Sequence, residues 1–415
     1  MPSPIERFPV IFVPGIKASG LDDYYPIERE TLWSAVVNKQ YDRLAMHPDD
    51  LRFEAMEPAM VRASAPLSIV YKDIIEALRY ELTPDDRKAV PVFAFGYDWR
   101  QDCFRSAAQL ELMVEEALAR TSLLPHYKGK APTRVDIVAH SMGGIVAALY
   151  LAARGKKARV RRVVTVGTPF RGAVDAVSLL AMGMGNFWGE MSREREREAA
   201  RSMSSVYQLL PWYEGAVASD VPEYRDLFKP EAWQRSIVQT LDLYRRRVSA
   251  DIEGEALLAL LLKNAAAVRD TLRKLDLAQA LEEGRRGWLP IAGMSERTMV
   301  QVSVEREGRS PRFGEFRTGN ENADTGDGTV PVRSAVPPFL GPEEVVCVRP
   351  QDFSFWEMKD RALSGVGGFH ASLPLMNLVQ RLTIRFLRPD YNGPVYGVPH
   401  PEAKQTRWPD WLGPA

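Results

Sequence analysis

The sequence has few cysteines, no long apolar run and no net charge. Among its 415 residues only Cys103 and Cys347 are cysteines, and neither belongs to a CxxC or histidine-rich pattern. This spacing argues against a disulfide framework and against structural zinc, so we expect no metal and no cofactor. The longest apolar runs fall short of the roughly 18 residues that a membrane-spanning helix needs.

The charges exclude a further class of partner. The chain carries 54 basic and 54 acidic side chains. It contains no basic block with interleaved aromatic residues, the usual signature of a nucleic-acid-binding surface. We therefore expect no nucleic acid among its partners, while the sequence leaves the oligomeric state open.

The N-terminal stretch MPSPIERFPVIFVPG lacks the basic start and long apolar core of a secretory signal. Together with the scarcity of cysteine, this favours a soluble protein in a reducing compartment, so we expect a cytoplasmic location. Export without a signal stays open, as does peripheral contact with a membrane surface.

Short apolar runs that end at glycine or proline recur along the chain. Such runs are typical of strands buried on both faces of a parallel sheet. Helical stretches, such as residues 104–121, separate them, and this alternation predicts an α/β three-layer sandwich with a mostly parallel central sheet. The runs lie at residues 9–15, 90–100, 133–141, 160–169 and 343–350.

Residues 183–294 break this alternation, because they show long helical patterns without a strand signal. We predict a helical cap inserted between an N-terminal core part (1–182) and a C-terminal core part with a tail (295–415). The cap begins with the glycine-rich stretch MGMGNFWG, in which Phe187 and Trp188 would form an apolar tip that contacts substrate or a lipid surface. The alternative is that both rings pack inward on the core.

A candidate nucleophile lies in VDIVAHSMGG, which has the pattern of a strand, a sharp turn and a helix. Ala139 and Gly143 flank Ser141 at two positions on either side, and their small size allows the tight turn of a nucleophile elbow. The usual pattern has glycine at both flanks, but alanine adds little bulk. The alternative is a serine that only caps the following helix.

A serine nucleophile needs a base and an acid, which follow it in the order serine, acid, histidine in folds with this elbow. His370, in the glycine-rich stretch SGVGGFHASLP, is favoured as the base over His400 in the proline-rich tail. Asp324 and Asp327 both lie between the serine and these histidines. The residues alone leave the two aspartates nearly level as the acid.

A set of motifs decides between the two aspartates. The motifs are PVIFVPGI near the start, YDWR at 97–100, AHSMGG at 139–144, GTPFRG at 167–172, SVYQLLPWY at 205–213 and GDGTVP at 326–331. Together and in this order, they resemble the lecithin:cholesterol acyltransferase family, which includes lysosomal phospholipase and phospholipid:diacylglycerol acyltransferases. The resemblance covers about residues 9–385 and implies an α/β-hydrolase fold, with Ser141 as nucleophile, Asp327 as acid and His370 as base.

The oxyanion hole needs two backbone donors. One should be the N–H of Met142, directly after the nucleophile, and the second should come from the loop VPGIKASG, where the resemblance implies Ile16. Animal members of the family have a disulfide-tied lid near the N-terminus, and the corresponding stretch YYPIERETLWSAVVN contains no cysteine. We expect Trp33 in this stretch to form an apolar wall that contacts lipid substrate.

These features predict a serine-dependent lipid acyl hydrolase or O-acyltransferase that acts on ester bonds through an acyl-enzyme. The acyl donor would be a phospholipid or a related ester, and the sequence does not say whether water or a lipid hydroxyl accepts the acyl group. One alternative is a carboxylesterase for soluble esters. Another is a hydrolase-fold binding protein without catalysis, although a binding role has no need of Ser141, Asp327 and His370 together.

Overall fold

The central sheet of the molecule has eight strands in the order β14-β13-β12-β9-β7-β6-β1-β5. Every pairing from β5 across to β12 is parallel, β12 pairs antiparallel with β13, and β13 pairs parallel with β14. The strands are β1 (Val10–Val13), β5 (Val92–Ala94), β6 (Val135–His140), β7 (Val160–Val166), β9 (Trp288–Gly293), β12 (Val346–Val348), β13 (Tyr396–Pro399) and β14 (Gly413–Pro414). The computed structural model describes residues 7–24, 28–37, 40–46, 60–83, 88–183, 193–247, 250–354, 357 and 368–414.

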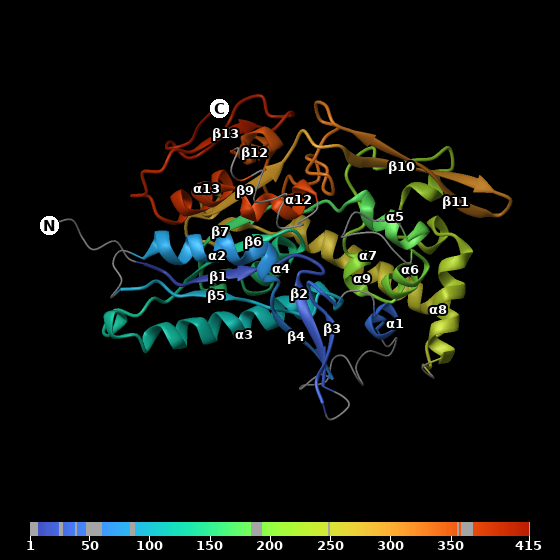
Figure 1. Ribbon diagram of the computed structural model, residues 1–415. Coiled ribbons are helices and arrows are strands. Elements are labelled where there is room, and N and C mark those ends of the chain that lie inside the picture. The colour runs from blue at the N-terminus through green and yellow to red at the C-terminus, as the bar shows by residue number, and fades with distance from the viewer. Residues whose placement is uncertain are drawn as a thin grey trace.

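Helices cover both faces of this sheet (Figure 1). Alternate residues of a strand point to opposite faces. Val10 and Phe12 of β1 therefore pack with α2 (Ser68–Leu82) and α13 (Asn377–Leu387), whereas Ile11 and Val13 pack with α3 (Cys103–Ser122) and α4 (Met142–Arg154). Burial on both faces explains the unbroken apolar runs. The predicted three-layer sandwich with a mostly parallel sheet is confirmed.

Two smaller sheets accompany the central one. The first consists of β2 (Ser19–Asp23), β3 (Glu30–Trp33) and β4 (Val61–Pro66), and the second of β8 (Val217–Ala218), β10 (Thr298–Glu307) and β11 (Ser310–Gly319). We expected the core to resume at residue 295, but β10 belongs to the second sheet. Its buried and partly exposed residues alternate, as in a strand with one solvated face, and not as in the core strands.

Helices dominate the predicted cap and lie with β10 and β11 at one end of the central sheet (Figure 1). The expected cap range, 183–294, is wrong at its C-terminal end, because it includes β9, which lies between β7 and β12 in the central sheet. Its sequence WLPIAG is a short, fully buried apolar run. It directly follows a helical pattern, so sequence periodicity did not distinguish the strand from the end of that pattern. The helices of this region are α5 (Val174–Met182), α6 (Arg193–Arg201), α7 (Ser204–Tyr207), α8 (Arg235–Arg247), α9 (Gly254–Lys274) and α10 (Leu277–Ala280).

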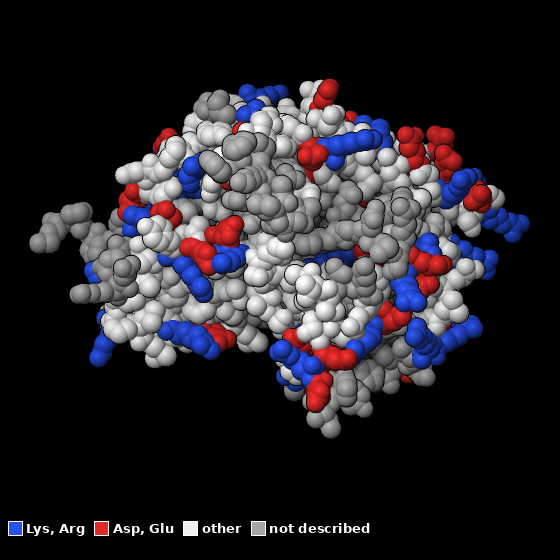
Figure 2. Space-filling model, viewed as in Figure 1, with Lys and Arg blue, Asp and Glu red and all other residues white. Residues whose placement is uncertain are grey.

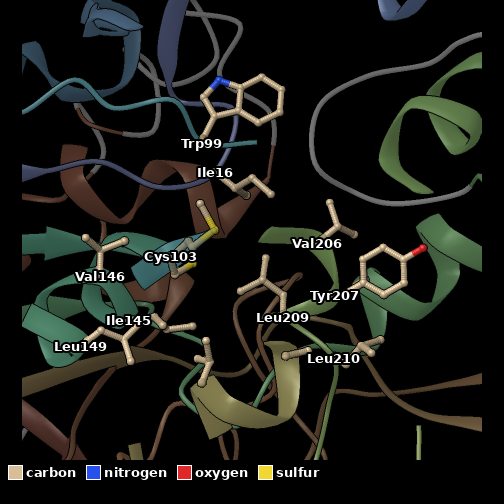
Figure 3. Packing of buried hydrophobic residues seen from close by; sticks show 14 of the residues in the cluster. Ile16, Trp99, Cys103, Ile145, Val146, Leu149, Val206, Tyr207, Leu209 and Leu210 are labelled. Carbon is tan, nitrogen blue, oxygen red and sulfur yellow. The ribbon is translucent and has the colours of Figure 1, made fainter. Parts of the chain in front are cut away.

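The YDWR motif supports the loop between β1 and β2. The Tyr97 hydroxyl donates to the Pro14 carbonyl at 2.9 Å, and Trp99 Nε1 donates to the Ser19 carbonyl at 3.1 Å. Arg100 is fully buried and forms two hydrogen bonds with the carboxylate of Asp98, at 2.9 and 2.7 Å. The motif therefore fixes both ends of this loop to the core, where Ile16, Trp99 and Cys103 share one buried cluster (Figure 3).

On the face shown in Figure 2, Lys and Arg side chains lie beside Asp and Glu side chains. This mixture fits the equal numbers of basic and acidic residues in the sequence. Among the described residues, none of the helices combines the length and apolar character that crossing a bilayer requires.

Candidate active site

Ser141 occupies a strained turn between β6 and α4. Its φ of 53° and ψ of −130° are rare for an L-residue and typical of a nucleophile elbow. The Ser141 N–H donates to the Val166 carbonyl at 2.8 Å. A Cβ on Gly143 would come within 2.5 Å of the carbonyl oxygens of Val13 and Pro14, so only glycine allows α4 to begin this close to β1. The Ser141 side chain makes no capping hydrogen bond to α4, and the alternative role as a helix cap is wrong.

The structure brings the three predicted residues Ser141, Asp327 and His370 together. His370, in the short helix α12 (Phe369–Ser372), lies with Nε2 at 2.9 Å from Ser141 Oγ and with Nδ1 at 2.7 Å from Asp327 Oδ2. A carboxylate can only accept, so Nδ1 carries the hydrogen and Nε2 accepts the hydrogen of the Ser141 hydroxyl. All three residues are buried, with exposed fractions of 4% for Ser141, 1% for Asp327 and 8% for His370.

The competing candidates are engaged elsewhere. Asp324 pairs with Arg317 at 2.8 Å and with Arg333 at 3.1 Å, and the hydrogen bond from Arg317 holds the pKa of Asp324 below its ordinary value. His400 Nε2 donates to the Val332 carbonyl at 3.2 Å, and its Nδ1 accepts from a backbone N–H. By contrast, Asp327 Oδ1 accepts backbone N–H groups, which leaves Oδ2 directed at His370.

The two expected oxyanion donors lie on opposite sides of the serine. Met142 is the first residue of α4, so its N–H is one of those that find no acceptor within the helix. On the other side, a Cβ on Gly15 would come 2.8 Å from Ser141 Cβ and 3.3 Å from Oγ. This close approach puts the peptide that joins Gly15 to Ile16 beside the nucleophile. The assignment of the Ile16 and Met142 N–H groups as oxyanion donors stays a prediction.

A hydrogen-bonded series that we did not predict from the sequence connects this loop to the base. The Gly15 N–H donates to Tyr71 Oη at 3.1 Å, and the Tyr71 hydroxyl donates to His140 Nδ1 at 2.9 Å. His140 Nε2 in turn donates to the His370 carbonyl at 3.1 Å. Tyr71 lies on the buried face of α2, where its spacing is that of any core residue, so no sequence signal marks it.

Trp33, which we expected to form an apolar wall in contact with lipid substrate, supports the β1–β2 loop. It is buried, its Nε1 donates to the Lys17 carbonyl at 2.7 Å, and its ring packs edge-on against Trp99 with centroids 5.4 Å apart. The indole N–H needs an acceptor when it is buried, and the Lys17 carbonyl provides it. The contact of Trp33 with lipid substrate stays a prediction. Phe187 and Trp188 lie outside the described residues.

Within the described ranges, His, Cys, Asp and Glu side chains form no group of three or more that could hold a metal ion. Cys103 and Cys347 are buried free thiols, and burial raises the pKa of both.

The buried histidines predict a loss of stability in mild acid. Burial, and then the charge of His370, holds the pKa of His140 well below its ordinary value of 6.5, and burial also lowers the pKa of His400. Below pH 6.5 the unfolded chain therefore binds protons that the folded chain does not. Each of these histidines should lower the free energy of unfolding by up to about 1.4 kcal/mol per pH unit in this range.

Urea unfolding at pH 7.5, 6.5 and 5.5 measures this effect. We expect the free energy of unfolding to be constant above pH 6.5 and to fall below it, with a smaller fall in His400→Asn. A free energy of unfolding that does not change between pH 7.5 and 5.5 would contradict the neutral state assigned to these imidazoles.

A mostly parallel sheet between helical layers, with a serine on a strained strand-to-helix turn, defines the α/β-hydrolase class. One chain in the crystal structure of the Tle4-Tli4 complex has this fold. It aligns with 92% of the present chain and 98% of its own length, with a TM-score of 0.65 and 14% sequence identity.

The sequence itself matches the family described as Lecithin:cholesterol acyltransferase over residues 53–251, which confirms the resemblance carried by the motifs. Phospholipase A(1) LCAT3 of Arabidopsis thaliana is 27% identical over 139 residues, which are 32% of this chain and 29% of that protein. The matched region thus spans less than a third of the length of this relative.

Proposed function

We propose that the protein is a serine-dependent enzyme that removes an acyl group from an ester lipid and transfers it, through an acyl-enzyme on Ser141, to water or to a lipid hydroxyl. The observation that carries this proposal is the hydrogen-bonded series from Asp327 through His370 to Ser141. The match to the lecithin:cholesterol acyltransferase family supports an acyl ester as substrate.

The geometry supports a two-step mechanism. His370 Nε2 takes the hydroxyl proton of Ser141 as Oγ attacks the ester carbonyl, and Asp327 stabilises the resulting imidazolium. The N–H groups of Ile16 and Met142 stabilise the oxyanion, and the C–O bond to the leaving alcohol breaks as His370 returns the proton to it. Water or a lipid hydroxyl then attacks the acyl-enzyme with His370 again as base, and Ser141 is regenerated.

One feature supports a lipid as the donor, and a second supports a lipid hydroxyl as the acceptor. The name of the plant relative refers to a phospholipase A(1), which releases one acyl chain from a phospholipid. The burial of Ser141 and His370 supports a site shielded from bulk water, where transfer to a lipid hydroxyl competes better with hydrolysis. We retain peripheral contact with a lipid surface through Phe187 and Trp188 as part of the proposal.

Mass spectrometry of the products tests this proposal. The protein is incubated with vesicles of mixed phospholipids that contain diacylglycerol or a sterol, and in parallel with p-nitrophenyl butyrate; Ser141→Ala is the control. We expect lysophospholipid together with free fatty acid or an acylated acceptor. Turnover of the soluble ester alone would favour a carboxylesterase, and a wild type no more active than Ser141→Ala on both substrates would favour a binding protein.

A further inference from the structure

The loop between β1 and β2 contains a buried, charged residue in a strained conformation. Lys17 follows directly on Ile16, has an exposed fraction of 6%, and adopts a φ of +59°. This left-handed region is unfavourable for a residue with a Cβ, and it persists only where surrounding contacts impose it. The strain lies next to the peptide that we expect to bind the oxyanion.

The side chain of Lys17 leaves the loop and pairs with a residue of α6. Its ammonium group forms an ion pair with the carboxylate of Glu196, of which only 13% is exposed. Tyr41 also donates a hydrogen bond to Glu196; burial, and then the charge of Glu196 and this hydrogen bond, raises the pKa of Tyr41 to about 12. Glu196 therefore contacts two buried residues, Lys17 and Tyr41, which come from separate segments of the chain.

The helix that carries Glu196 is itself fixed to the body of the protein. At its C-terminal end Arg201 Nε donates to the Leu180 carbonyl of α5 at 2.9 Å, and Nη1 donates to Thr240 Oγ1 of α8 at 2.6 Å. Because α6 is anchored in this way, the carboxylate of Glu196 is a fixed point to which Lys17 is held.

We infer that Glu196 is a positioning residue for the oxyanion hole, which it influences through Lys17. The inference rests on the proposed function. By holding the Lys17 ammonium, Glu196 keeps the loop in its strained conformation and keeps the Ile16 N–H beside Ser141 Oγ.

The loop between β1 and β2 is strained at Lys17 and held at both of its ends. Loss of the Glu196 charge removes this ion pair from a buried ammonium, which favours movement of the Lys17 side chain toward water. The strained backbone of Lys17 then relaxes. Since β1 and β2 hold the two ends of the loop, the relaxation moves the peptides between them, including the one that carries the Ile16 N–H. Stabilisation of an oxyanion is sensitive to displacements of about 1 Å.

The test compares Glu196→Gln with Glu194→Gln. Both substitutions remove one negative charge from α6. Glu194, however, is exposed, and its ion pair with Arg197 is long, at 3.7 Å. For p-nitrophenyl butyrate we expect Glu196→Gln to lower kcat about tenfold with KM within about twofold of wild type. Hydrogen exchange in the peptide that contains residues 14–20 should become faster. Glu194→Gln should match wild type in all three measurements.

A double-mutant comparison separates energetic coupling between Lys17 and Glu196 from a nonspecific loss of structure. Lys17→Met keeps most of the length of the side chain but removes the ammonium that pairs with Glu196, so it should lower kcat as Glu196→Gln does. Because both changes break the same contact, the double variant should be no slower than either single variant. Losses in kcat that multiply would contradict the inference, as would unchanged exchange or unchanged kcat in Glu196→Gln.

The proposed function can fail separately. If the wild-type protein turns over esters no faster than Ser141→Ala, the proposed function is wrong, and the catalytic part of the inference falls with it. The exchange measurement then still decides whether Glu196 holds the loop. If the wild-type protein is active and Glu196→Gln changes neither kcat nor exchange, the inference alone is wrong.

Discussion

Ser141→Ala and His370→Ala are each expected to lower kcat for ester cleavage by about 10⁵- to 10⁶-fold, since members of a triad act as one unit. For the same reason the double variant should be little slower than either single variant. Without Oγ no acyl-enzyme forms, and without the imidazole the site loses the base that lies 2.9 Å from the hydroxyl. The measurement is kcat on p-nitrophenyl butyrate, with urea unfolding to show that each variant is folded.

His400→Ala is the matched control, because His400 is also a buried histidine with a hydrogen bond to a backbone carbonyl. It should lose stability, because the Val332 carbonyl loses its donor, but the folded fraction should keep most of its kcat. Losses in Ser141→Ala and His370→Ala that multiply in the double variant would show independent action and contradict the assignment. A His400→Ala variant as inactive as His370→Ala would contradict it equally.

Asp327→Asn is expected to lower kcat by about 10⁴-fold while the fold is retained. Asp327 Oδ1 accepts the backbone N–H groups of Thr329 and Val330 at 3.1 and 2.7 Å. An asparagine carbonyl can keep these bonds, so its NH₂ group would face His370 Nδ1. The imidazole would then carry its hydrogen on Nε2, the wrong tautomer to accept the hydroxyl hydrogen of Ser141.

Asp324→Asn is the control for this prediction. It removes the same charge three positions away in the chain and breaks the ion pairs with Arg317 and Arg333, but these contacts lie outside the hydrogen-bonded series. We expect kcat close to that of wild type. If Asp324→Asn were the slower of the two variants, Asp327 would not be the acid.

Local patterns made much of the fold predictable. The central strand β1 is buried on both faces and appears in the sequence as an unbroken apolar run, and β6 and β7 are mostly buried and rich in β-branched residues. The elbow was predictable because a strained turn close to other backbone demands small residues, such as Gly143. The order of residues along the chain left His370 and His400, and the glycine-rich loop favoured His370. The choice of Asp327 over Asp324 depended on the family resemblance.

Long-range contacts explain what sequence analysis missed. Lys17 and Glu196 are 179 positions apart, and Gly15 and Tyr71 are 56 positions apart, so no local pattern joins either pair. The hydrogen bond of Trp33 was not predictable for the same reason, because the Lys17 carbonyl that accepts its N–H belongs to another strand connection. β9 was missed because a short buried strand and the end of a helical pattern look alike without knowledge of the neighbours in the sheet.

The central claim is that Ser141 forms the covalent intermediate. Peptide mass spectrometry after reaction with a fluorophosphonate, which modifies activated serines, tests it most directly. We predict one phosphonyl group per chain, located on the peptide that contains Ser141, and almost no modification of His370→Ala in the same time. Modification of a different serine, or ester turnover that continues while Ser141 stays unmodified, would contradict the claim.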